Sequence, residues 1–171
     1  GIGPQIDTSE FQFDTLMDDP FYALVPKRLL ETDKDTIQLS SLGDMPLLVL
    51  NQATAMRNML EEVMKEKRLR FNLRYEFTQA QTLISMASTG LGAAILPGVA
   101  LPGKIDSAMH ALRIVNPSLS RRVALITARG QALSPASMRL AELLRQLIPL
   151  PTEQKRGRSI PRQHKGTAYQ G

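Results

Sequence analysis

The alternation of apolar and polar residues is clearest between residues 46 and 96, where it predicts three strands separated by two helices. PLLVL (46–50) is continuously apolar, which is typical of a strand buried on both faces. Residues 55–67 have helical periodicity through Met56, Leu60, Val63 and Met64, and Thr54 is the expected N-cap. Residues 72–77 alternate like a strand, residues 78–89 form a helix capped by Thr78, and residues 93–96 form a strand that Pro97 ends.

This β-α-β-α-β order predicts a parallel sheet with right-handed crossovers. Ligands of such sheets bind outside the carboxyl ends of the strands. Here those ends are Asn51 to Thr54, Thr78 with Gln79, and Pro97 with Gly98. The first two segments also begin helices, so their free backbone amides favour a carboxylate or a similar anion.

The glycine-rich stretch TGLGAAILPGVAL (89–101) is predicted to be a joint between a helix and a strand. A phosphate-binding loop has the order strand, glycines, helix, which directs amides and the positive end of the helix dipole at the anion. Here the order is reversed, with Gly90 ending the helix in a left-handed conformation and Gly92 tightening the turn. Pro97 also interrupts the stretch well short of the length needed to cross a bilayer.

Further elements flank this unit on both sides. Strands are predicted at 21–26, 111–115 and 121–127, and a polar stretch at 27–45 contains a short apolar turn near Leu39 and Leu42. Ser134 and Pro135 begin a final helix that runs to about Ile148. Its apolar residues must pack on something, and the 46–96 unit has no obviously uncovered face, so a second lobe made from both ends of the chain is expected.

Composition narrows the possible functions. The 171 residues are 43% hydrophobic and 22% charged, as in a globular protein, and contain no cysteine, which excludes disulfides and thiolate chemistry. The net charge of +5 is concentrated after Thr152, in a tail expected to be disordered, so the body is not predicted to bind nucleic acid. His110 and His164 lie far apart in the sequence, and no metal site is expected.

The sequence shows no set of catalytic residues. A Gly-x-Ser-x-Gly motif is absent, and the adjacent Asp18 and Asp19 before Pro20 are predicted to form a turn rather than an acid/base pair. Arg57, in the first turn of a helix, either helps to hold an anionic ligand or is an exposed helix charge. Thr54 and Thr78 are either caps alone or caps that also contact a ligand.

Taken in order, these signals resemble the effector-binding domain of LysR-type transcriptional regulators over about residues 1–149. The resemblance is carried by GIGP, DDPFYALVP, SLGDMPLLVL, NQATAMR, YEFTQAQTLISMASTGLGAAILPGVAL and SRRVALITARGQALSPASMRLAELLRQL. YEFT followed by a helix and GLGAAILP is the most specific part. The sequence departs from the family at Ala53, Thr54 and Ala55, where many members have Gly-Ser-Gly, and around Arg68, where a glycine is usual.

The resemblance implies an α/β, periplasmic-binding-protein-like (type 2) two-lobed fold with parallel-rich sheets and an incomplete first lobe. Residues 1–38 would be a remnant of the first lobe plus a crossover, and residues 39–130 the second lobe. Residues 131–151 would be a helix returning to the first lobe, and residues 152–171 a disordered basic tail. The DNA-binding helix-turn-helix and the start of the first lobe would precede Gly1, so the chain is expected to be a fragment.

The resemblance also implies a function. A small anionic effector, such as a carboxylate, would bind between the lobes, with Ile2, Gly3 and Pro4 facing Asn51, Gln52, Thr54, Thr78, Gln79 and Pro97. No cofactor and no enzymatic activity are expected, and DNA would be bound only through the absent helix-turn-helix. The intact protein would be a cytoplasmic bacterial homodimer or homotetramer that uses the helix at 55–67, without membrane association.

Two other function classes remain possible at this point. A solute-binding protein of a transporter shares the fold and predicts a secretion signal in the parent gene, whereas a regulator predicts a helix-turn-helix there. An enzyme on an α/β scaffold would need a nucleophile and a base, and the sequence offers no such set.

Overall fold

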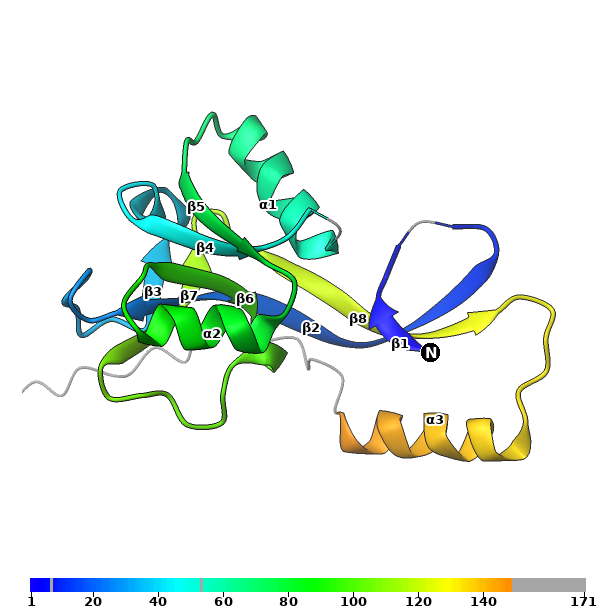
Figure 1. Ribbon diagram of the computed structural model, residues 1–171. Helices are drawn as coiled ribbons and strands as arrows, with labels where there is room; N and C mark the ends of the chain where they lie inside the picture. The colour runs from blue at the N-terminus through cyan, green and yellow to red at the C-terminus, as the bar shows by residue number, and fades with distance from the viewer. Residues whose placement is uncertain (7, 53, 149–171) are drawn as a thin grey trace, which may run out of the picture.

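The computed structural model of the chain describes residues 1–6, 8–52 and 54–148 (Figure 1). Within them lie the strands β1 (Ile2–Pro4), β2 (Phe11–Pro26), β3 (Thr36–Gln38), β4 (Pro46–Leu50), β5 (Asn72–Phe77), β6 (Ala93–Pro97), β7 (Met109–Val115) and β8 (Ser120–Ala128). The α-helices are α1 (Ala55–Glu66), α2 (Ala80–Ser88) and α3 (Pro135–Leu147), and short 3-10 turns occupy Leu39–Leu42 (η1) and Gly98–Ala100 (η2).

The predicted parallel unit is present. β4 pairs in parallel with β5 on one side and with β6 on the other, and α1 and α2 form the two crossovers. The sheet continues beyond β6 to β2, which pairs with β6 and β7 in antiparallel orientation, and β3 adds to β7 in parallel orientation. We call these six strands with α1 and α2 the parallel lobe. Its helices and neighbouring parallel strands confirm the predicted mixture of α and β structure.

The two faces of this sheet carry separate hydrophobic clusters because successive strand residues point to opposite faces. Leu47, Val49 and Ile95 lie in the cluster that contains Met56 and Leu60 of α1. Leu48, Ala94 and Leu96 pack with the buried residues of α2, which are Leu83, Ile84 and Ala87. The position of β4 therefore requires a continuously apolar strand, because a helix covers each face of the sheet there.

The long strands β2 and β8 connect the parallel lobe to a smaller region. The first part of β2 pairs with β8, whose other edge pairs with β1, and the last part of β2 enters the parallel lobe. The sequence predicts the strand at 121–127 in β8, but of β2 it predicts only residues 21–26. The predicted turn at Asp18 and Asp19 is wrong, because both lie inside β2 and pair with Arg122 and Arg121 of β8.

The smaller region consists of β1, the first half of β2, β8 and α3, and we call it the extension (Figure 1). As predicted, α3 begins at Ser134, whose side chain accepts a hydrogen bond from the Ser137 amide, and has Pro135 in its first turn. Its cluster has only three buried members, Leu16, Leu125 and Ala141. Leu140 and Leu147 are 57% and 76% exposed, so most of the apolar face of α3 is not covered by the described residues.

Several local features differ from the sequence prediction or refine it. Thr78 is not the cap of α2, because Gln79 occupies the N-cap position and makes no capping hydrogen bond with its side chain. Gly90 is left-handed as predicted, with φ of 85°, and a Cβ on Gly92 would collide with the carbonyl oxygen of Pro46. Arg68 follows α1 with φ of 54°, a conformation that favours glycine.

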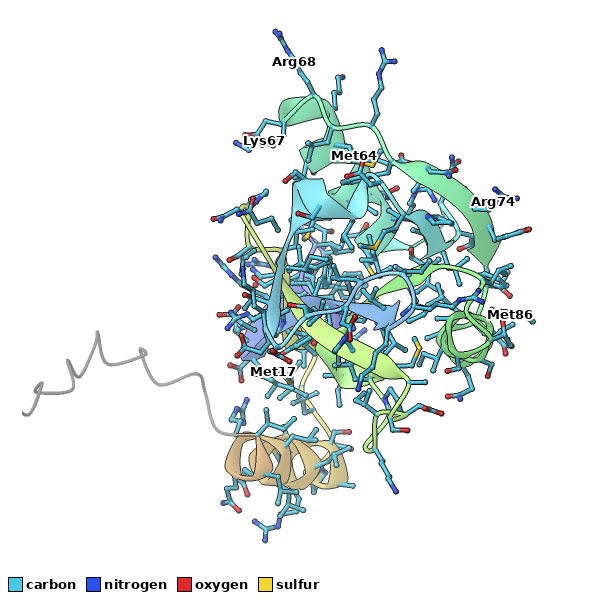
Figure 2. The ribbon with its side chains drawn as sticks, turned by 90° about the vertical axis from the view of Figure 1, so that its left-hand side faces the viewer. Met17, Met64, Lys67, Arg68, Arg74 and Met86 are labelled. Carbon is cyan, nitrogen blue, oxygen red and sulfur yellow. The ribbon has the colours of Figure 1, made fainter. Side chains whose placement is uncertain are left out.

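Figure 2 shows Lys67 and Arg68 at the end of α1, projecting away from the rest of the molecule. Among the described residues, no helix is both long enough and apolar enough to cross a membrane. The predicted basic tail (152–171) lies outside the described residues.

Candidate functional site

The strand ends of the parallel lobe form one rim, which carries six of the eight predicted site residues. Leu50 pairs with Phe77, and the Asn51 amide donates a hydrogen bond to the Phe77 carbonyl at 2.9 Å, so Asn51 adjoins Thr78. Leu48 pairs with Ala94, and continuing this register places Asn51 beside Pro97. Asn51, Gln52, Thr54, Thr78, Gln79 and Pro97 therefore follow three neighbouring strands at the same edge.

Thr54 holds the turn that precedes α1. Its hydroxyl donates to the Asn51 carbonyl at 2.9 Å and accepts from the Arg57 amide at 3.3 Å. The hydroxyl proton is thus already used within the turn. The groups that this turn offers to an anion are the backbone amides at the start of α1, where the first-turn N–H groups lack helical acceptors.

Thr78 and Gln79 are both exposed at the start of α2. Because the Gln79 side chain makes no capping hydrogen bond, the first turn of α2 has no side-chain partner from its own cap residue. The dipoles of α1 and α2 both place their positive ends at this rim, an arrangement that favours negative charge.

Ile2 and Gly3 lie on the extension and not on the rim. They pair with Leu125 and Ala124 of β8. Ile2 is 54% exposed and lines a cavity of about 700 Å³ between β1, β2, β8 and α3, together with Leu140 and Leu144. The structure does not bring Ile2 into a common cavity with the rim residues.

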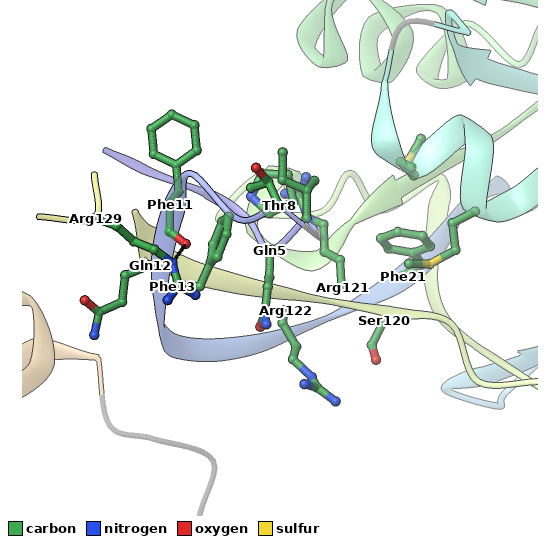
Figure 3. A pocket seen from close by; sticks show the side chains of 14 residues that line it. Gln5, Thr8, Phe11, Gln12, Phe13, Phe21, Ser120, Arg121, Arg122 and Arg129 are labelled. Atoms are coloured by element: carbon green, nitrogen blue, oxygen red, sulfur yellow. Dashed lines mark hydrogen bonds between the residues drawn. The ribbon is translucent and has the colours of Figure 1, made fainter. Parts of the chain in front are cut away.

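A second cavity, of about 620 Å³, lies where the parallel lobe meets the extension (Figure 3). Its lining residues are Pro4, Gln5, Ile6, Thr8, Phe11, Gln12, Phe13, Phe21, Met56, Met59, Ser120, Arg121, Arg122 and Arg129. We call it the junction cavity. It adjoins the rim, because Met56 is two residues after Thr54 and Phe21 pairs with Pro97.

An ion pair between β2 and β8 lies at the junction cavity. Arg121 donates from Nε to Oδ2 of Asp19 at 2.9 Å, and the side chains of Arg121 and Asp19 are 24% and 1% exposed. Oδ1 of Asp19 also accepts a hydrogen bond from the Val99 amide at 3.0 Å. The carboxylate therefore links both long strands to the turn that follows β6.

Arg57 is also buried, with 4% of its surface exposed, so the alternative of an exposed helix charge is wrong. Its Nε donates to Glu61 at 2.7 Å, and Nη1 lies 3.1 Å from a carboxylate oxygen of Glu76 on β5. The two glutamates more than offset its single positive charge, which favours a structural role that fixes α1 against the sheet. Among the described residues, no group of three or more His, Asp or Glu side chains is placed to hold a metal ion.

Sequence reasoning missed the junction cavity and the Asp19–Arg121 pair. The available signal was that Asp19 would lie on the same strand face as the apolar Met17 and Phe21, which predicts an inward-facing carboxylate that needs a cationic partner. The identity of that partner, 102 residues away in the sequence, had no local signal.

Known proteins resemble this chain along most of its described length. The family model described as "LysR substrate binding domain" matches residues 1–149. The "Uncharacterized HTH-type transcriptional regulator YbhD" of Escherichia coli (strain K12) is 24% identical over 81% of this chain and 44% of its own length. The chain thus spans less than half the length of that relative.

Solved structures share the fold. The regulatory domain of CcmR from Synechocystis PCC6803, in complex with 2-PG, has a TM-score of 0.75 at 15% identity and covers 86% of this chain and 72% of its own. The effector-binding domain of QuiR in complex with shikimate has a TM-score of 0.71 at 17% identity, with coverage of 86% and 70%.

Proposed function

Because the chain belongs to the LysR substrate-binding domain family, we propose that it senses a small anionic effector for a transcriptional regulator. Members of this family are regulators and not enzymes, and the helix-turn-helix relative supports a regulator over the alternative of a transporter's solute-binding protein. In the proposal, the effector binds between two lobes and changes DNA binding through a helix-turn-helix domain elsewhere in the intact protein, a cytoplasmic homodimer or homotetramer.

The observation that carries the proposal is the rim itself. Three adjacent parallel strands end together, and two of them lead into helices whose N-termini meet the same edge. Such an edge attracts anions through backbone amides and helix dipoles. The effector contacts that we propose are Asn51, Gln52, Thr54, Thr78, Gln79 and Pro97 from the parallel lobe, with Ile2 and Gly3 from the extension.

The mechanism requires that the effector bind one arrangement of the lobes better than another, since a ligand with equal affinity for both shifts no equilibrium. β2 and β8 are the connections between the parallel lobe and the extension, so a change in their relative arrangement bends these strands. The 2-PG and shikimate complexes support an effector of small size, because they are complexes of proteins with the same fold.

The test is a thermal-stability screen of the complete natural protein that contains this chain, against a panel of mono- and dicarboxylates. A true effector at 100 times its dissociation constant stabilises the folded state by about 2.7 kcal/mol, which raises the unfolding temperature by several degrees. The effector should also change the protein's DNA occupancy in cells, measured by chromatin immunoprecipitation.

Substitutions then test the rim. Thr78→Ala should reduce the stabilisation by the effector, whereas Thr82→Ala, at an exposed position on α2, should leave it unchanged. If no carboxylate stabilises the protein, or if rim substitutions leave the stabilisation intact, the proposed site is wrong.

A further inference from the structure

Arg121 lines the junction cavity, and its side chain is held by an ion pair with the buried Asp19. Its partner Asp19 is fully buried, with 0% exposed surface, whereas the Arg121 side chain is 24% exposed. A buried carboxylate strongly favours a charged, hydrogen-bonded partner. Arg121 is therefore held in one place at the cavity surface, as a pre-organised binding group requires.

The pair leaves most of the guanidinium available. Among the hydrogen bonds of the described residues, Arg121 uses only its Nε. A planar guanidinium can hold a carboxylate or phosphate with two parallel hydrogen bonds. Arg122 and Arg129 also line the cavity, so three guanidinium groups are available there to attract an anion.

The rest of the lining contains apolar side chains beside the polar Gln5, Thr8, Gln12 and Ser120. Ile6 and Phe11 are 56% and 37% exposed, and Phe13 and Met59 are half-buried. These side chains would lose unfavourable contact with water if an apolar group covered them. The volume of about 620 Å³ lies within the usual range for small-molecule sites.

We propose that Arg121, positioned by Asp19, holds the anionic group of the effector in the junction cavity, and that the effector is a carboxylate with an apolar body. This inference rests on the proposed function and specifies its ligand. It assigns the contact to a strand between the lobes, in addition to the rim residues.

The carboxylate of Asp19, which positions Arg121, also contacts the turn next to the rim. Asp19 accepts a hydrogen bond from Val99, two residues after Pro97, and a Cβ on Gly98 would lie only 3.2 Å from Oδ1 of Asp19. Because the turn after β6 packs this closely on Asp19, the carboxylate that positions Arg121 also contacts the end of the rim strand β6.

The first experiment uses calorimetric titration of the full chain with three probes. Phenylacetate has the charge and the apolar body, phenylacetamide lacks the charge, and glycolate lacks the apolar body. Phenylacetate should bind saturably with millimolar or tighter affinity, and the other two probes at least about tenfold more weakly. Absence of saturable phenylacetate binding, or equal binding of either comparison probe, would overturn the inference.

The second experiment uses variants. Arg121→Gln should weaken phenylacetate binding about tenfold or more, and Arg121→Lys should restore part of it. Arg113→Gln, at an exposed position on β7, removes the same charge outside the cavity and should have no effect. Equal phenylacetate affinity in Arg121→Gln and the unsubstituted chain would contradict the proposed contact.

Asp19 acts through Arg121, so its role needs a different measure. Asp19→Asn should reduce the ratio of phenylacetate to phenylacetamide affinity, whereas a purely structural defect would weaken both probes and preserve the ratio. Should the Arg121 variants fail to fold, the guanidinium NMR signals of Arg121 in the unsubstituted chain provide the test. They must shift as phenylacetate saturates the protein, and unchanged signals would refute the inference.

The outcomes also separate this inference from the proposed function. A carboxylate that stabilises the complete protein through Thr78 but not through Arg121 leaves the function standing and removes the inference. If no carboxylate stabilises the complete protein, the proposed function fails as well.

Discussion

The parallel lobe and the extension use similar amino acids to very different effect. In the parallel lobe, both faces of the sheet are covered by helices, and Leu47, Leu48 and Leu60 are completely buried. In the extension, α3 is just as amphipathic, yet Ala141 is its only buried residue among those described. The difference shows that a helical pattern forms a helix locally but forms a core only where a second surface is present.

The largest predicted difference between the two regions is in the cost of removing a leucine side chain. Leu47→Ala should destabilise the chain by about 3 kcal/mol, because a buried leucine loses its packing and leaves a cavity. Leu140→Ala on α3 should cost less than about 0.5 kcal/mol, since 57% of Leu140 is exposed. Denaturant unfolding of both variants measures the two losses of unfolding free energy. Equal losses would mean that α3 packs as tightly as the parallel lobe.

The connection between the two regions is tested by Asp19→Ala. The substitution removes the partner of Arg121 and of the Val99 amide, and we expect a loss of about 2 kcal/mol in unfolding free energy. Asp19→Asn keeps an acceptor for Val99 and should cost less. A loss within experimental error for Asp19→Ala would show that the buried pair does not hold the strands together.

A stabilising substitution is predicted at the end of α1 in the parallel lobe. Arg68 adopts φ of 54°, which costs a residue with a Cβ about 1 kcal/mol relative to glycine. Arg68→Gly should therefore raise the unfolding free energy by up to about 1 kcal/mol, with Lys67→Gly, at the neighbouring exposed position, as a destabilising control. If thermal denaturation shows that Arg68→Gly destabilises the chain, the left-handed conformation at this residue is wrong.

The smallest effect is expected for the exposed ion pair between Arg145 of α3 and Asp14 of β2. Arg145 and Asp14 lie 2.6 Å apart, but their side chains are 52% and 48% exposed. Asp14→Ala should change the unfolding free energy by no more than about 0.5 kcal/mol, in contrast to Asp19→Ala. A loss as large as that of Asp19→Ala in the same unfolding assay would contradict the assigned difference in burial.

The sequence was sufficient for elements whose determinants are local. The apolar run at 46–50, the Thr54 cap and the Ser134-Pro135 start of α3 all appear in the structure as predicted. Each depends on residues within about one helical turn or one strand, which is the range over which periodicity and capping act.

The sequence was insufficient where distant residues decide the structure. Asp18, Asp19 and Pro20 have strong local turn preferences, but pairing with β8 holds them in a strand. The three-residue strand β3 exists only because β7 lies beside it. The rim could be predicted from the order of elements, whereas the junction cavity depends on contacts between the two ends of the chain and has no local signature.

An amide NMR titration of the chain with phenylacetate probes the rim and the junction cavity in one experiment. If both bind the same anion, the amide signals of Asn51, Gln52 and Thr78 on the rim and of Val99 and Arg121 at the junction cavity should shift saturably with one dissociation constant. Shifts confined to α3 and β1, or shifts at the rim and at Arg121 with different dissociation constants, would contradict a single anion site between the parallel lobe and the extension.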